Sequence, residues 1–104
     1  MNSTIETSTY TAVAGDNIFA DVSGGVFTIT LPITGAIGDT IYINDIAGKF
    51  DITNITINRN GHNINAVANN LTCDLKNATY KFVYSNVTYG WIYTIARLGL
   101  VYDE

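Results

Sequence analysis

Val26-Phe27-Thr28-Ile29-Thr30-Leu31-Pro32 is the stretch that decides the fold. Large apolar side chains stand at positions 27, 29 and 31, and the positions between them carry threonine. Because successive side chains of a β-strand point to opposite faces, this alternation predicts a strand with one face in a core. Proline has no N–H to give to a neighbouring strand, so Pro32 ends the strand.

The same period of two continues along most of the chain, and no segment has the spacing of an amphipathic helix. Asn60-Gly61 is the clearest turn signal, and it predicts a hairpin whose return strand is residues 63–66. Short strands at this spacing predict an all-β fold, namely a single-domain antiparallel β-sandwich, jelly-roll-like, of eight or nine short strands. The predicted strands are residues 9–13, 17–22, 26–31, 40–46, 54–59, 63–66, 71–75, 80–84 and 89–96.

Length and composition indicate one domain, residues 1–104, with room for one hydrophobic core. A polar N-terminal arm covers about residues 1–7, and an apolar C-terminal tail covers about residues 97–104. Hydrophobic residues make up 47% of the chain and charged residues only 13%, which is a low charged fraction for a soluble domain. Thr and Asn supply the polar side chains in place of charged residues. A surface of this kind favours close packing between subunits because it does not repel neighbouring copies.

The charge balance argues against nucleic acid as a partner. The net charge is −4 and the pI is near 4.6, whereas a protein that binds the phosphate backbone needs clustered Lys and Arg. No apolar run reaches the roughly 18 residues of a membrane span, so no membrane insertion is expected. The first residues carry no signal-peptide pattern, and the single cysteine, Cys73, excludes an intramolecular disulfide.

The residues that could carry chemistry are few, so we predict no catalytic residue, no metal site, no cofactor and no enzymatic activity. His62 is the sole histidine, and a general base needs a partnered nucleophile. Cys73 alternates with two leucines and is predicted to be a small buried hydrophobe. A small hydrolase is the least favoured alternative. Five aspartates near strand ends are predicted to close turns through the backbone, with a calcium site as the alternative: Asp16, Asp21, Asp39, Asp45 and Asp51.

Several distinct turn and strand motifs are spread along most of the chain. They are residues 10–16 (YTAVAGD), 21–32 (DVSGGVFTITLP), 38–41 (GDTI), 55–61 (ITINRNG), 70–72 (NLT) and 80–84 (YKFVY), followed by Gly90-Trp91. This set resembles a small β module of bacteriophage tail fibres and capsid-decoration (head fibre or cement) proteins. The resemblance implies a virion structural protein, often a homotrimer, without catalytic residues. It also implies capsid or tail proteins of the same virion as partners, and a location on the particle surface after synthesis in the host cytoplasm.

Surplus apolar residues on a chain of this size predict a subunit interface. The residues assigned to it are Leu98, Leu100, Val101, Tyr102 and Val26. The interface would serve a capsid decoration (cement) or fibre subunit that acts by oligomeric surface assembly.

An aromatic cluster near the end of the chain supports an alternative function. Alternation places Tyr89, Trp91 and Tyr93 on one face of a strand, where core or subunit contact is the first interpretation. If these rings are exposed, they are possible glycan-stacking residues of a carbohydrate- or host-receptor-binding module of a tail fibre. A host surface glycan is therefore an alternative partner.

Overall fold

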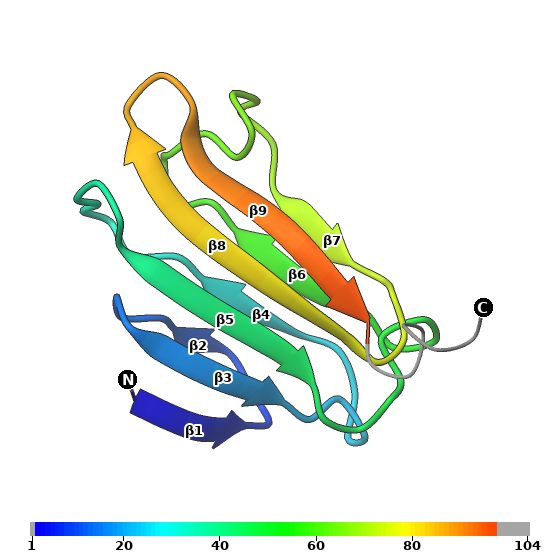
Figure 1. Ribbon diagram of the computed structural model, residues 1–104. Coiled ribbons are helices and arrows are strands. Elements are labelled where there is room, and N and C mark those ends of the chain that lie inside the picture. The colour runs from blue at the N-terminus through cyan, green and yellow to red at the C-terminus, as the bar shows by residue number, and fades with distance from the viewer. Residues whose placement is uncertain (1, 98–104) are drawn as a thin grey trace.

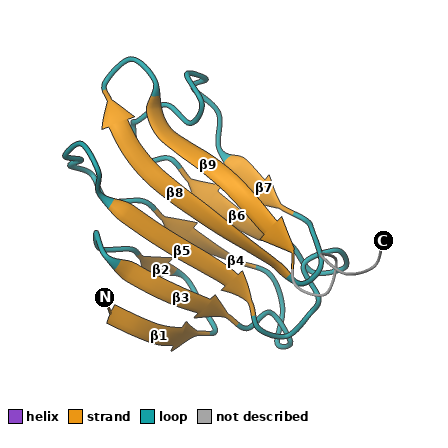
Figure 2. Ribbon diagram, viewed as in Figure 1, coloured by secondary structure: helices purple, strands orange, loops and turns teal. Residues whose placement is uncertain are grey.

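The computed structural model describes residues 2–97. This part of the chain contains nine β-strands, joined by loops and turns, and no helix (Figures 1 and 2). The all-β prediction is therefore confirmed. No helix in this part is long and apolar enough to cross a membrane. The strands are β1 (Asn2–Glu6), β2 (Tyr10–Thr11), β3 (Asp16–Ala20), β4 (Phe27–Thr30), β5 (Thr40–Asp45), β6 (Ile55–Asn58), β7 (Leu71–Cys73), β8 (Ala78–Asn86) and β9 (Gly90–Arg97).

The strands form two sheets, one behind the other in the view of Figure 1. The front sheet has the order β1-β3-β5-β8-β9, and the back sheet has the order β2-β4-β6-β7. Alternate side chains of both sheets meet in one core, as the period of two predicts. The buried apolar residues are Ala12, Ile18, Ala20, Val22, Phe27, Ile29, Leu31, Ile41, Ile43, Phe50, Ile55, Ile57, Ile64, Cys73, Ala78, Tyr80, Phe82, Tyr84 and Trp91.

Strand direction differs from the prediction of an antiparallel sandwich. The chain alternates between the sheets from β1 to β6, and the pairs β1–β3, β3–β5, β2–β4 and β4–β6 are parallel. Antiparallel pairing is limited to β6–β7, β5–β8 and β8–β9. When successive strands go to opposite sheets, the chain returns to each sheet in the same direction, so its neighbours there are parallel. Both sheets are mixed, and the jelly-roll-like order is not confirmed.

Two predicted segments also differ. Residues 63–66 form no strand, although Asn60 and Gly61 do turn the chain with φ values of 50° and 87°. The antiparallel partner of β6 is β7, which follows a longer loop. The polar N-terminal arm includes β1, which lies beside β3 at the edge of the front sheet.

Aspartates fix the turns that bring β3 and β5 together. Oδ2 of Asp16 accepts the N–H of Val13 at 2.8 Å, and Oδ2 of Asp39 accepts the N–H of Ala36 at 2.9 Å. The glycine before each aspartate has a φ of 92°, a conformation that favours glycine. The predicted role of aspartates as turn-closing residues is confirmed at both positions, and these two turns hold one end of the front sheet.

Candidate functional site

The outer side of the front sheet is the broadest exposed strand surface of the described residues, and we call it the front face. Inward and outward side chains alternate on its strands, so strand pairing sets which residues lie next to one another. The residues of the front face are Ser3, Ile5, Asn17, Phe19, Thr40, Tyr42, Asn44, Thr79, Lys81, Val83, Ile92, Thr94 and Ala96.

Four polar side chains of the front face bind one another across the strands. The amide nitrogen of Asn17 donates to Oγ of Ser3 at 3.3 Å, and the amide nitrogen of Asn44 donates to Oδ1 of Asn17 at 2.8 Å. Oγ1 of Thr79 donates to Oδ1 of Asn44 at 2.8 Å. These four residues come from β1, β3, β5 and β8. Because they satisfy one another, covering them with another protein costs less than covering free polar groups.

One end of the front face is a shallow apolar groove of about 280 Å³, lined by Ser3, Thr4, Ile5, Phe19 and Ile46. Ile5 lies opposite Phe19 in the β1–β3 pair. Ile5 is 64% exposed and Ile46 is 49% exposed. We call Ile5, Phe19 and Ile46 the groove residues. Large exposed aliphatic side chains that lie together are typical of surfaces that another chain covers.

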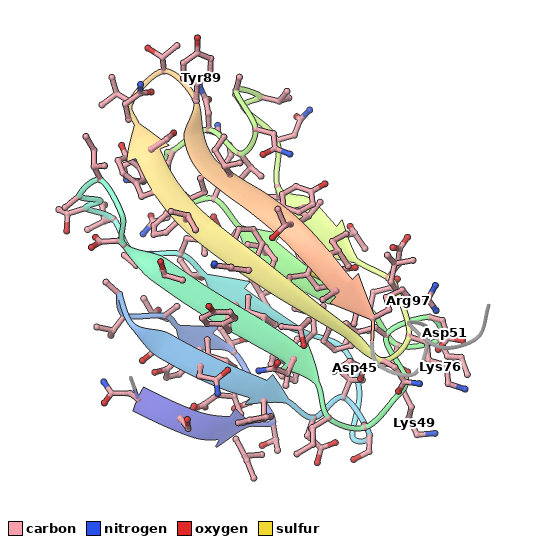
Figure 3. All side chains as sticks on the ribbon, in the orientation of Figure 1. Asp45, Lys49, Asp51, Lys76, Tyr89 and Arg97 are labelled. Carbon is pink, nitrogen blue, oxygen red and sulfur yellow. The ribbon has the colours of Figure 1, made fainter. Side chains whose placement is uncertain are left out.

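The front face is almost free of charge. Lys81 is its only charged residue within positions 2–97, and its ammonium group lies 5.8 Å from the centre of the Tyr42 ring. The other four cations lie elsewhere: Figure 3 shows Lys49, Lys76 and Arg97 together at one end of the molecule, and Arg59 follows β6 in the back sheet. An uncharged face suits a protein partner better than a nucleic acid or an acidic polymer.

The outer side of the back sheet, which we call the back face, differs in chemistry. Its strands present Thr11, Thr28, Thr30, Thr56 and Thr72. Within the described chain, none of these hydroxyls makes a side-chain hydrogen bond. Val26, assigned from the sequence to a subunit interface, lies on this side and is 70% exposed. It lines a groove of about 440 Å³ with Thr28 and Thr56.

The aromatic cluster does not form a stacking platform. Trp91 is completely buried and its ring packs edge-on against Tyr84, with ring centres 5.2 Å apart. Its assignment as a glycan-stacking residue is therefore wrong, because a sugar cannot reach the ring. Tyr93 is half-buried beside Phe82. Tyr89 is exposed, but it lies in the β8–β9 turn at the far end of the molecule from Lys49 (Figure 3).

The remaining interface residues from the sequence, Leu98, Leu100, Val101 and Tyr102, lie outside the described residues. The sequence reasoning also missed all three groove residues. One signal was present: Ile18 and Phe19 are adjacent large apolar residues of one strand, so one of them has to face outward. Ile5 was missed because β1 was not expected to be a strand.

The chemistry-bearing side chains serve structure. Cys73 is buried, and burial raises the pKa of its thiol. Nε2 of His62 lies 2.7 Å from the carbonyl oxygen of Ile33, and Nδ1 lies 3.4 Å from the hydroxyl of Tyr84. Among residues 2–97, no three His, Cys, Asp or Glu side chains lie close enough together to hold a metal ion.

The carboxylate of Asp45 makes the densest set of hydrogen bonds in the described chain. Oδ1 accepts the N–H groups of Gly48 and Lys49 at 2.9 and 3.1 Å. Oδ2 accepts those of Phe50 and Asn77, both at 3.0 Å. This cluster fixes the loop after β5, from which Ile46 reaches the apolar groove.

No protein-family model matches the chain, and no curated protein matches it.

Proposed function

We propose that this chain is a structural subunit of a bacteriophage particle that works by oligomeric surface assembly through its front face. The front face carries the proposal: it combines exposed apolar side chains with a row of four polar side chains that bind one another, and Lys81 is its only charge within the described residues. The sequence resemblance to tail-fibre and capsid-decoration modules supports the phage setting.

Burial of this face supplies the driving force. Covering a large apolar side chain contributes roughly 1.5 to 3 kcal/mol, or less where part of it is already buried. The three groove residues alone therefore contribute a few kcal/mol per subunit contact. Several further apolar side chains of the front face, including Val83 and Ile92, extend the contact.

In this proposal the partners are sister chains in a homotrimer, and capsid or tail proteins of the same particle. The chain is made in the host cytoplasm and ends on the particle surface, as a decoration (cement) or fibre subunit. It performs no reaction, which fits the structural use of its His, Cys and Asp side chains. Its role is to add area and contacts to an assembly.

Purified particles test this role. Quantitative mass spectrometry of particles should detect the chain in a fixed copy number, in multiples of three. Antibody labelling in the electron microscope should place it on the capsid or on the fibres. Absence from particles, while the chain is abundant in the infected cell lysate, would refute a virion role.

A further inference from the structure

The two edge strands of the front sheet, β1 and β9, run in the same direction. Among the described strands β1 pairs with β3 alone and β9 pairs with β8 alone. β1 and β3 are parallel to β5, and two antiparallel steps make β9 parallel to β5 as well (Figure 1). A rotation about an axis along the strands therefore brings β9 of one copy beside β1 of the next. Such a head-to-tail contact closes into a ring when the rotation between copies is a whole fraction of a turn, and a third of a turn gives a trimer.

The free part of β9 is its second half. Loop residues 63–66 lie along the first half, where the N–H of Trp91 donates to the carbonyl oxygen of Asn63 at 2.8 Å. The N–H of Tyr93 donates to Oδ1 of Asn65 at 3.3 Å. Beyond Tyr93 no described segment makes a backbone hydrogen bond to this edge, and at its end the side chain of Arg97 donates to the carbonyl oxygen of Lys76 at 3.2 Å, so the backbone of this half of the edge is open.

Strand register places the apolar groove at the same level as the end of β9. Ile5 pairs with Phe19, Phe19 with Asn44, Asn44 with Thr79, and Thr79 with Ala96. The groove and Ala96 therefore occupy the two ends of one row across the front face. Four steps of about 4.8 Å separate β1 from β9, which is about 19 Å.

The residues after β9 lie closer to most of a neighbour's groove than to most of their own. From Arg97 to Leu100 is three residues, which span at most about 10 Å when fully extended. Within one copy, Ile46 is two strand steps from β9, about 10 Å, whereas Phe19 is three steps away, about 14 Å, and Ile5 is four. In a second copy set edge to edge, Ile5 lies one strand spacing from Ala96 and Phe19 lies two.

Charges at the two edges complement one another. Starting from the β1 edge, Glu6 pairs with Ala20 and Ala20 pairs with Asp45. At the opposite edge, Arg97 pairs with Ala78. Asp45 and Ala78 are the next positions beyond the Asn44–Thr79 pair, so Glu6 and Arg97 share one row at opposite edges. Edge-to-edge contact brings Arg97 of one copy beside Glu6 of the next.

We propose that Leu98 and Leu100 of one copy bind the Ile5–Phe19–Ile46 groove of the next copy in a head-to-tail ring, with Arg97 facing Glu6 across the contact. This inference rests on the proposed assembly through the front face and names the segment and the groove that make it. The occupant is a second copy of this chain, because the groove and the segment are both apolar, edge-to-edge contact brings Ile5 and Phe19 within two strand spacings of β9, and Arg97 and Glu6 carry complementary charges at the same contact.

Engineered disulfides test the contact directly, because Cys73 is buried and does not compete. Phe19→Cys and Leu100→Cys are made singly and together, and each preparation is oxidised under mild conditions. A mixture of the two single variants should give a covalent dimer, and the double variant should give covalent oligomers that end at the ring size. Thr56→Cys on the back face replaces Phe19→Cys in the control pair, which should not cross-link.

The outcomes separate this inference from the proposed function. A double variant that forms only an intramolecular disulfide would show that the segment covers its own groove and would overturn the inference. An oligomer of native size without any Phe19–Leu100 cross-link would overturn it too, yet leave assembly through the front face standing. A single-chain mass for the unmodified protein would remove both.

A charge reversal tests the edge contact independently. Arg97→Glu alone and Glu6→Lys alone should each raise the dissociation constant of the oligomer, by about tenfold for a contact worth roughly 1.4 kcal/mol. The double reversal should restore most of the lost affinity. If the losses of the two single variants simply add in the double variant, Arg97 and Glu6 do not pair.

Discussion

Removal of the Asp45 carboxylate tests how the loops hold the front sheet in place. Asp45→Ala leaves four N–H donors without their acceptor, those of Gly48, Lys49, Phe50 and Asn77. A hydrogen bond to a charged group contributes roughly 1.5 to 3 kcal/mol, and solvent replaces part of the loss where the loop is accessible. We therefore expect the free energy of unfolding to fall by about 3 to 5 kcal/mol, a large share of the 5 to 15 kcal/mol of a typical domain.

Urea denaturation followed by tryptophan fluorescence measures this change, because Trp91 is completely buried and becomes exposed on unfolding. The matched control is Asp51→Ala, which removes an exposed carboxylate of the same loop that makes no hydrogen bond within the described chain. The control should change the free energy of unfolding by less than about 0.5 kcal/mol. If Asp45→Ala loses less than about 1 kcal/mol, the four-bond cluster does not stabilise the fold as we infer.

Three further predictions concern the core and its turns. A Cβ at Gly90 (φ 70°) would overlap the backbone carbonyl of Asn63, so Gly90→Ala should lower the free energy of unfolding by more than about 2 kcal/mol in urea denaturation. Gly61 (φ 87°) faces open space, so Gly61→Ala should lower it by only about 1 kcal/mol, and equal losses would contradict the overlap. Burial raises the pKa of Tyr80 to about 12, above the value near 10 of an unfolded tyrosine, so the urea midpoint should hold below about pH 9 and fall as the pH rises from about 10 to 12. The hydrogen bond to Asp16 raises the pKa of Tyr10 to about 12 as well, so Tyr80→Phe should remove only part of that fall, and an unchanged slope would contradict it. The Cys73 thiol should react with iodoacetamide far more slowly in the folded chain than in urea, as mass spectrometry can follow; equal rates would contradict its burial.

The sequence predicts strand positions well because the period of two reports burial directly. Phe27, Ile29 and Leu31 are buried as expected, and so are the isoleucines of β5 and β6. The relative direction of neighbouring strands was not predictable in the same way. Alternation says which side of a strand faces the core, but it does not say which strand lies beside it or how that strand runs. The parallel pairs arise from connections that cross between sheets, and their lengths carry no such signal.

The candidate site was harder to predict than the fold. The polar segment that contains Ile5 looks like an arm until β3 is known to lie beside it, because an edge strand needs only one partner. The burial of Trp91 agrees with the first interpretation of the aromatic cluster as core, and the alternation that grouped it with the exposed Tyr89 fails for a local reason. Tyr89 belongs to the turn before Gly90, and the irregular pairing between Tyr84 and Asn86 shifts the strand, so alternation through residue 89 did not predict exposure at residue 91.

Molar mass in solution, measured by light scattering on a size-exclusion column, tests the front face as a subunit interface most directly. The unmodified protein should elute at three times the 11.3 kDa of one chain. Phe19→Lys on the front face should elute at the mass of one chain, and Thr56→Lys on the back face should leave the trimer intact. A single-chain mass for the unmodified protein at tens of micromolar, or a trimer that survives Phe19→Lys, would contradict the account.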